Sequence, residues 1–108
     1  MSEDLNVLDQ HLMLAILRLR PGAYGVAIQK WIEERTGRKY SVGAIYAGLD
    51  RLEEKGYARS KPGESTPERG GRAKLYFNVT APGVYALRQS LQSLDAMRKG
   101  ISGKEVLA

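Results

Sequence analysis

Apolar residues recur every three or four positions between residues 5 and 19, which is the spacing of one helical face. Leu14 and Leu17 widen this arc beyond a single stripe, so the predicted helix has two faces to bury. Pro21 and Gly22 then predict that the helix ends in a turn. The residues that share the first face are Leu5, Leu8, Leu12, Ala15, Ile16 and Leu19.

The same spacing predicts two further helices. One covers roughly residues 24–36, and Gly37 after it favours a left-handed C-terminal cap. Ser41 is a good N-cap for the other helix, which ends at Gly56. The apolar positions are Tyr24, Ile28, Trp31 and Ile32 in the first of these helices and Ile45, Leu49 and Leu52 in the second.

Residues 57–79 change from helical spacing to the pattern of a β-hairpin. Residues 57–61 predict one strand, and residues 62–71, rich in Pro, Gly, Ser, Thr and Glu, predict a long tip. The return strand, residues 73–79, alternates between two faces as a half-buried strand does. Leu75, Phe77 and Val79 share one face, and Lys74, Tyr76 and Asn78 share the other.

Thr80 predicts the N-cap of a last helix. Four apolar residues in it, Val84, Leu87, Leu91 and Leu94, form a heptad-like seam that favours packing against a partner helix. Residues 100–108 have no periodicity, so we expect a flexible tail. Because of the apolar seam in the last helix, we expect a homodimer. Its predicted contacts are Leu8, Leu12, Leu87, Leu91 and Leu94.

The order helix, helix, helix, β-hairpin, helix is the topology of a winged helix-turn-helix domain followed by a dimerisation helix. We predict a mainly α fold with a small β-hairpin. The winged helix-turn-helix domain covers residues 1–80, the C-terminal dimerisation helix 81–99 and the tail 100–108. Topology alone leaves open whether such a domain binds DNA or other proteins.

Composition limits the class of protein further. A chain of 108 residues, 43% of them hydrophobic, fits one domain, and the absence of cysteine excludes disulfides and thiolate metal sites. The N-terminal residues do not form a signal sequence, and no apolar run approaches the about 20 residues of a membrane span. We expect a cytoplasmic protein without membrane contact. The formal net charge of +5 favours a polyanionic partner.

The first half of the third helix, residues 41–49, carries no charged side chain. Small residues let a helix approach the major groove closely, and an acidic residue there would repel DNA. The alternatives are that the small residues pack against a neighbouring helix and that the tyrosine lies at the edge of the core. The residues predicted to face DNA are Ser41, Gly43, Ala44, Tyr46 and Ala47.

Basic residues gather in the hairpin, where glycines at 70 and 71 let the tip lie close to a sugar-phosphate backbone. More of them stand beside the turn between the second and third helices, where Arg35 would add a phosphate contact. A hairpin that is merely solvated is the alternative. The predicted wing and backbone contacts are Arg38, Lys39, Lys61, Arg69, Arg72 and Lys74.

Three motifs in these elements resemble the PadR-like family of transcriptional regulators, over roughly residues 12–90. They are the Tyr-Gly pair at 24–25, the pattern Ser-x-Gly-x-Ile-Tyr-x-x-Leu-x-Arg-Leu at 41–52, and the wing segment 70–80. The chain departs from the family at Val42 and Ala47, where proline is frequent, so its sequence preference is expected to differ.

The resemblance implies a sequence-specific homodimeric repressor that binds double-stranded DNA at a palindromic operator. It also implies release by a small aromatic or lipophilic effector bound between subunits. Trp31 is a candidate for lining such a pocket, but an aromatic residue at helical spacing is more often core packing. We name no effector.

An enzyme has little support in the sequence. His11 is the single histidine, and no phosphate-binding glycine motif or metal-ligand spacing is present. We therefore predict no catalytic residue, no metal and no cofactor. The alternative to a DNA-binding regulator is a winged-helix module that binds proteins, and salt dependence separates the two because only phosphate contacts weaken steeply with salt.

Overall fold

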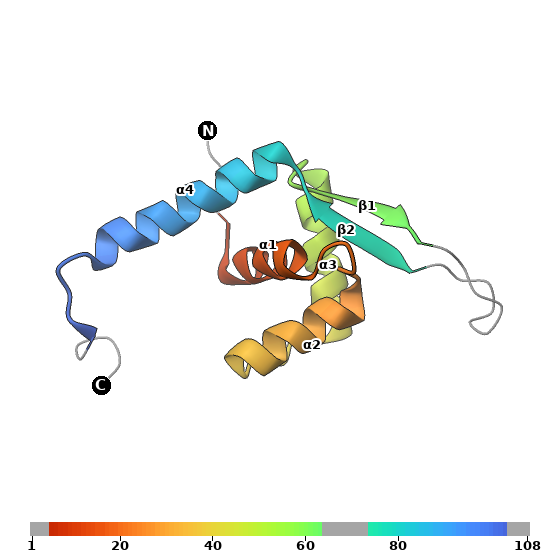
Figure 1. Ribbon diagram of the computed structural model, residues 1–108, viewed down its shortest axis with the longest axis horizontal. Coiled ribbons are helices and arrows are strands. Elements are labelled where there is room, and N and C mark those ends of the chain that lie inside the picture. Colours follow the sequence, from red (N-terminus) through yellow and green to blue (C-terminus); the bar gives the residue numbers. More distant parts are fainter. Residues whose placement is uncertain (1–4, 64–73, 104–108) are drawn as a thin grey trace.

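The computed structural model describes residues 5–63 and 74–103. Its elements, in chain order, are α1 (Val7–Leu19), α2 (Gly25–Thr36), α3 (Val42–Glu54), β1 (Ala58–Pro62), β2 (Leu75–Val79) and α4 (Ala81–Arg98). Figure 1 shows α1, α2 and α3 packed together, with the hairpin extending to one side. From the base of the hairpin, α4 runs past the N-terminal end of α1 and away from the other elements (Figure 1). This is the predicted mainly α fold with one small hairpin.

The helix ends lie where the capping residues predict them. The Ser41 hydroxyl accepts a hydrogen bond from the Ala44 backbone N–H at 3.0 Å, and the Thr80 hydroxyl accepts one from the Gly83 N–H at 3.1 Å. Both satisfy a backbone donor that the first turn of a helix leaves unpaired. Gly37 ends α2 with a φ of 75°, the left-handed region that favours glycine.

The core lies where the apolar faces of α1, α2 and α3 meet. An apolar side chain that is fully buried in such a core stabilises the fold by about 1.5–3 kcal/mol. Gly48 lets α1 and α3 approach closely, because a Cβ at this position would come within 2.6 Å of Leu12 Cδ1. The buried apolar residues are Leu5, Leu12, Met13, Ala15, Ile16, Ala23, Ile28, Ile32, Ile45, Leu49, Leu52, Ala58, Phe77 and Leu87.

The two strands pair antiparallel, with Ala58 opposite Val79 and Pro62 opposite Leu75. β1 begins one residue later than predicted, because the Tyr57 N–H still donates to the Leu52 carbonyl at the end of α3. Phe77 is buried as the alternation predicts. Leu75 is 45% exposed, since it lies farther along the hairpin, which extends beyond the three helices (Figure 1).

The sheet has a third partner that the sequence did not indicate. The Phe77 N–H donates to the carbonyl of Ala23 at 2.8 Å, so the α1–α2 connection lies along the free edge of β2. This bond ties the hairpin to the start of α2.

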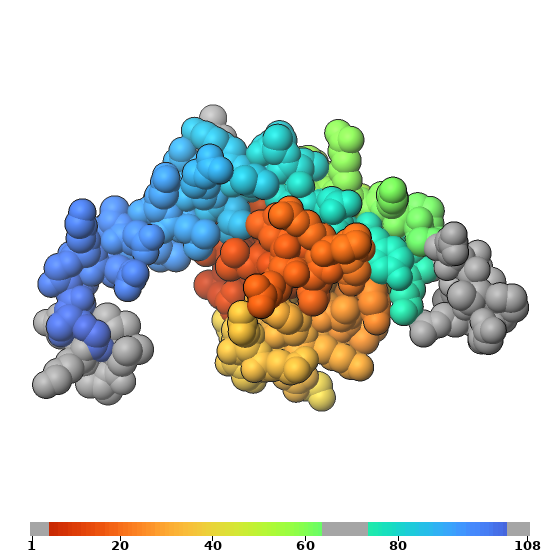
Figure 2. Space-filling model, viewed as in Figure 1, coloured from red at the N-terminus to blue at the C-terminus, as the bar shows by residue number. Residues whose placement is uncertain are grey.

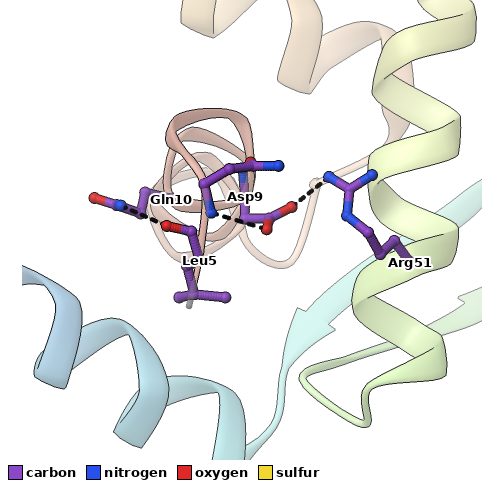
Figure 3. Close-up of polar contacts among 5 residues, drawn as sticks. Leu5, Asp9, Gln10 and Arg51 are labelled. Carbon is purple, nitrogen blue, oxygen red and sulfur yellow. Dashed lines mark hydrogen bonds and ion pairs between the residues drawn. The ribbon is translucent and has the colours of Figure 1, made fainter. Parts of the chain in front are cut away.

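A buried ion pair joins α1 to α3. Asn6 and Asp9 form a capping box in which each side chain accepts a hydrogen bond from the other residue's N–H, at 2.7 and 3.1 Å. The second carboxylate oxygen of Asp9 accepts from Arg51 Nη2 at 2.5 Å (Figure 3). The Asp9 side chain is only 2% exposed, so this guanidinium compensates for the water that the carboxylate has lost.

Within the described residues, every helix is too short or too polar to cross a membrane.

We predict that Arg51→Met lowers the free energy of unfolding by about 2 kcal/mol, because it keeps the aliphatic stem but leaves the Asp9 carboxylate buried without a cation. Urea denaturation followed by circular dichroism measures this change. Arg59→Met is the matched control, since Arg59 is exposed on β1, and its effect should stay within about 0.5 kcal/mol. Equal losses in the two variants would contradict the role given to the ion pair.

Candidate nucleic-acid interface

The N-terminal half of α3 presents a small, uncharged surface. Ser41, Gly43 and Ala47 are exposed and Ala44 is half-buried, while the opposite face of the helix is part of the core. Gly43 has open space around it, since a Cβ there would meet nothing nearer than the Ser41 hydroxyl at 3.9 Å. Gly43 and Ala47 are therefore not packed against a neighbouring helix, which was the alternative interpretation of these small residues.

Tyr46 has two roles in the same half of α3. Its side chain lies over Gly25 at the start of α2, so closely that a Cβ at Gly25 would overlap the ring. The residue is nevertheless 38% exposed. Tyr46 is thus at the edge of the core, as the alternative proposed, and still contributes to the outer surface of α3.

Two of the predicted phosphate contacts lie on the α2–α3 connection. Arg38 and Lys39 are both exposed, directly before the N-terminus of α3. The Arg38 guanidinium lies 5.3 Å from the centre of the Tyr40 ring, and Arg35 lies 5.1 Å from that of Trp31. Aromatic faces attract such cations and hold them in place. The first turn of α3 carries no acidic residue that would oppose an anion at the positive end of the helix dipole.

The outer ends of the two strands, away from α4, carry two more of the predicted basic residues. Lys61 is exposed on β1. Lys74 comes directly before β2, and its ammonium lies 4.1 Å from the centre of the Tyr24 ring. The predictions for Arg69 and Arg72, and for the glycines beside them, fall outside the described residues.

The predicted dimer contacts fall into two groups. Leu12 and Leu87 are buried within the chain itself, at 0% and 4% exposure, so they stabilise the single chain and leave no apolar surface for a partner. Leu8 is half-buried against the same core. Only Leu91 and Leu94 are exposed, on the part of α4 that projects from the rest of the molecule (Figure 2). The predicted seam omits three exposed apolar residues. Tyr85 and Met97 lie on α4, and Ile101 follows it.

Trp31 is packed against the core, and Arg35 lies over its ring, so the interpretation of Trp31 as a packing residue is confirmed. In the part of the chain that the structure describes, no three His, Asp or Glu side chains come together as metal ligands.

His11 connects α1 to the α2–α3 connection. Its Nδ1 lies 3.3 Å from the Tyr40 hydroxyl, and the two rings meet edge to face. Burial lowers the pKa of His11 below its ordinary value of 6.5, and the positive charge of Arg38 lowers this pKa further. His11 is therefore neutral when it contacts Tyr40 and helps to hold the α2–α3 connection against α1.

The helix pair α2–α3 and the following hairpin form a winged helix-turn-helix, and the exposed, uncharged half of α3 with basic residues before it is the surface of the DNA-binding class. The model of the transcriptional regulator PadR-like family matches residues 13–93, and the chain belongs to this family. This confirms the resemblance inferred from its motifs. No curated protein matches the chain.

Solved structures of similar proteins have the same fold. A transcriptional regulator from Clostridium thermocellum is 25% identical, with a TM-score of 0.71 and coverage of 87% of this chain and 85% of that one. A PadR family transcriptional regulator from Eggerthella lenta is 26% identical, with a TM-score of 0.68 and coverage of 88% and 80%. A PadR family transcription regulator from Clostridium difficile, 24% identical with a TM-score of 0.70, covers 95% of this chain and is itself covered completely.

We predict that acidification destabilises the fold through His11. Because its pKa is lowered in the folded chain, only the unfolded chain binds this proton in the window below pH 6.5. The contribution of His11 to stability is fully present above that pH and is lost as the pH falls through the lowered pKa. Urea midpoints at about pH 7.5 and 5.5 should therefore differ less in His11→Gln than in the wild type. The same difference in both proteins would contradict this role.

Proposed function

We propose that the protein acts in the cytoplasm as a homodimeric, sequence-specific repressor that occupies a palindromic operator, without catalysis. The observation that carries this proposal is the exposed, uncharged half of α3, together with the basic residues that precede it and those on the hairpin. Arg38 and Lys39 precede the helix, and Lys61 and Lys74 stand at the outer ends of the hairpin strands. This arrangement suits a helix that enters a groove between two phosphate backbones.

The division of contacts follows from the chemistry of each surface. Gly43 and Ala47 add little bulk, so the backbone of α3 can come close to the base edges in a groove about 12 Å wide. The cations bind phosphates, which provides affinity and orientation but no sequence information. Ala44 and Tyr46 therefore carry the sequence preference, and the departures from the family at Val42 and Ala47 modify it.

The apolar end of α4 supports assembly of two copies. Leu91 is 36% exposed and Leu94 is 55% exposed, on a helix whose last two turns extend away from the core. A second copy related by a two-fold axis would cover both residues. Two copies would place their α3 helices in successive major grooves, about 10–10.5 base pairs apart, which accounts for a palindromic site.

A groove beside α4 is the candidate binding site for the small effector that the family resemblance implies. Its volume is about 600 Å³, and Leu5, Tyr57, Tyr85 and Leu94 contribute apolar or aromatic side chains to its walls. A small aromatic or lipophilic molecule bound here would contact α4 directly and could change how two copies meet. Trp31 is not among the residues that line this groove.

The test is selection of bound sequences from a random pool of duplex DNA, followed by affinity measurements for the enriched site and a scrambled site across a salt series. Enrichment of a two-fold-symmetric site, with a preference that survives moderate salt, is the expected result. Salt-sensitive binding without any enriched sequence would contradict a sequence-specific regulator. It would favour the alternative, a winged-helix module that binds proteins.

We predict that α3 and the wing contribute differently to binding. Tyr46→Phe keeps the ring over Gly25 and removes only the hydroxyl, so it should change the ranking of sites more than the affinity for scrambled DNA. Arg72→Ala should weaken binding to every sequence and reduce the dependence of affinity on salt by about one phosphate contact. Competition binding with a small panel of site variants measures both effects. The wing prediction is wrong if Arg72→Ala leaves the salt dependence unchanged.

We predict that Leu91→Glu converts the dimer into monomers, because it places a charge inside the apolar interface at a cost far above that of an exposed glutamate. Sedimentation equilibrium measures the dissociation constant. Gln92→Glu introduces the same charge at the next, exposed position of α4 and should leave the dimer intact. A dimer that survives Leu91→Glu would exclude this face of α4 as the interface.

A further inference from the structure

An aromatic cluster joins the wing to the start of α2. The Tyr24 and Tyr76 rings meet edge to face, with centres 5.7 Å apart and planes at 79°. The Lys74 ammonium lies over the Tyr24 ring, 4.1 Å from its centre. Tyr24 thus contacts two consecutive side chains on one face of the chain that leads into and through β2.

A glycine on each side of this cluster leaves room for a tyrosine ring. Gly63, directly after β1, lies so close to the Tyr76 ring that an added Cβ would overlap it, and its N–H donates to the Lys74 carbonyl at 2.7 Å. On the other side, Gly25 follows Tyr24 and lies against Tyr46 of α3. A continuous series of contacts therefore leads from the exposed surface of α3 to the outer end of the hairpin strands.

Tyr24 occupies the N-cap position of α2 but does not cap the helix with its side chain as N-cap residues usually do. It precedes the first turn of α2, but its side chain makes no capping hydrogen bond. It is half-buried and lies outside the buried core. Its ring is instead used to hold Lys74 and Tyr76, and the neighbouring bond from the Phe77 N–H to the Ala23 carbonyl keeps β2 beside it.

We propose that Tyr24 is a positioning residue for DNA binding, whose ring holds the Lys74 ammonium where it meets a backbone phosphate while α3 lies in the groove. The inference rests on the proposed DNA-binding function and adds a residue to it that does not itself contact DNA. A lysine side chain that is held in one place loses less conformational entropy on binding than a free one. The face of the ring supplies the hold, so a phenylalanine is able to replace the tyrosine and an aliphatic residue is not.

The experiment is a double-mutant cycle with Tyr24→Leu, Lys74→Gln and the double variant, and with Tyr24→Phe as the matched control. The probe is a duplex of about 30 base pairs of arbitrary fixed sequence, because phosphate contacts do not depend on sequence. Dissociation constants are measured across a salt series. Lys74→Gln should reduce the slope of log K against log salt by about 0.9 and weaken binding about fivefold near 0.15 M salt.

Tyr24→Leu should weaken binding in the wild-type background, and should have no further effect in Lys74→Gln. Tyr24→Phe should leave the affinity unchanged. If Tyr24 were important only for stability, Tyr24→Leu would weaken binding equally in the two backgrounds, and that result would overturn the proposal.

Two further outcomes separate this inference from the proposed function. If the wild type binds the duplex but Lys74→Gln has the wild-type slope, Lys74 contacts no phosphate and only the inference fails. If the wild type does not bind duplex DNA, both fail. Should Tyr24→Leu not fold, the chemical shifts of the Lys74 ε-methylene protons in the wild type decide. A shift upfield by the Tyr24 ring that persists in the complex with DNA supports the proposal, and its loss on binding contradicts it.

Discussion

The carboxylate of Asp9 has lost nearly all contact with water and therefore requires a cation. Arg51, which lies 42 residues later in the sequence, supplies it. The Asp9 carboxylate accepts a hydrogen bond from the Asn6 N–H in the capping box of α1, and Arg51 reaches the same carboxylate from the third turn of α3. At this junction Gly48 removes the side chain that would separate the two helices. Two residues after Arg51, Glu53 accepts hydrogen bonds from the backbone N–H and hydroxyl of Ser60 on β1. The helix α3 is thus joined to α1 by the ion pair of Arg51 and to β1 by the hydrogen bonds of Glu53.

Much of the fold could be predicted from the chain because its signals are local. Ser41 and Thr80 cap helices through their own hydroxyls, Gly37 has the conformation that ends α2, and Phe77 points inward as the alternation of a strand requires. The contacts between elements could not be predicted in this way. Periodicity identifies an apolar face but not what covers it, so Leu12 and Leu87 were assigned to a partner although the same chain covers them.

The candidate site shows the same division. The small uncharged surface of α3 was predictable because it depends on residue type and helical phase. The position of Lys74 was not, since it depends on the Tyr24 ring at the start of α2, far from Lys74 in the sequence. The sequence predicted no role for Asp9, because nothing in a single sequence connects it to position 51. The resemblance to the family rests on motifs that each lie within one element, so the sequence alone is enough to infer it.

The exposed end of α4 has a consequence for how the protein responds to its own abundance. Residues 91–100 are all exposed in the single chain, and a helix of this length without tertiary contacts is only marginally stable in water. In the proposed homodimer, a second copy supplies those contacts, so ordering of this helix and assembly are one equilibrium. Below the dissociation constant of the dimer, the amount of binding-competent protein then grows with the square of the chain concentration. A twofold change in expression would produce about a fourfold change in operator occupancy at that limit, which makes the regulator sensitive to gene dosage.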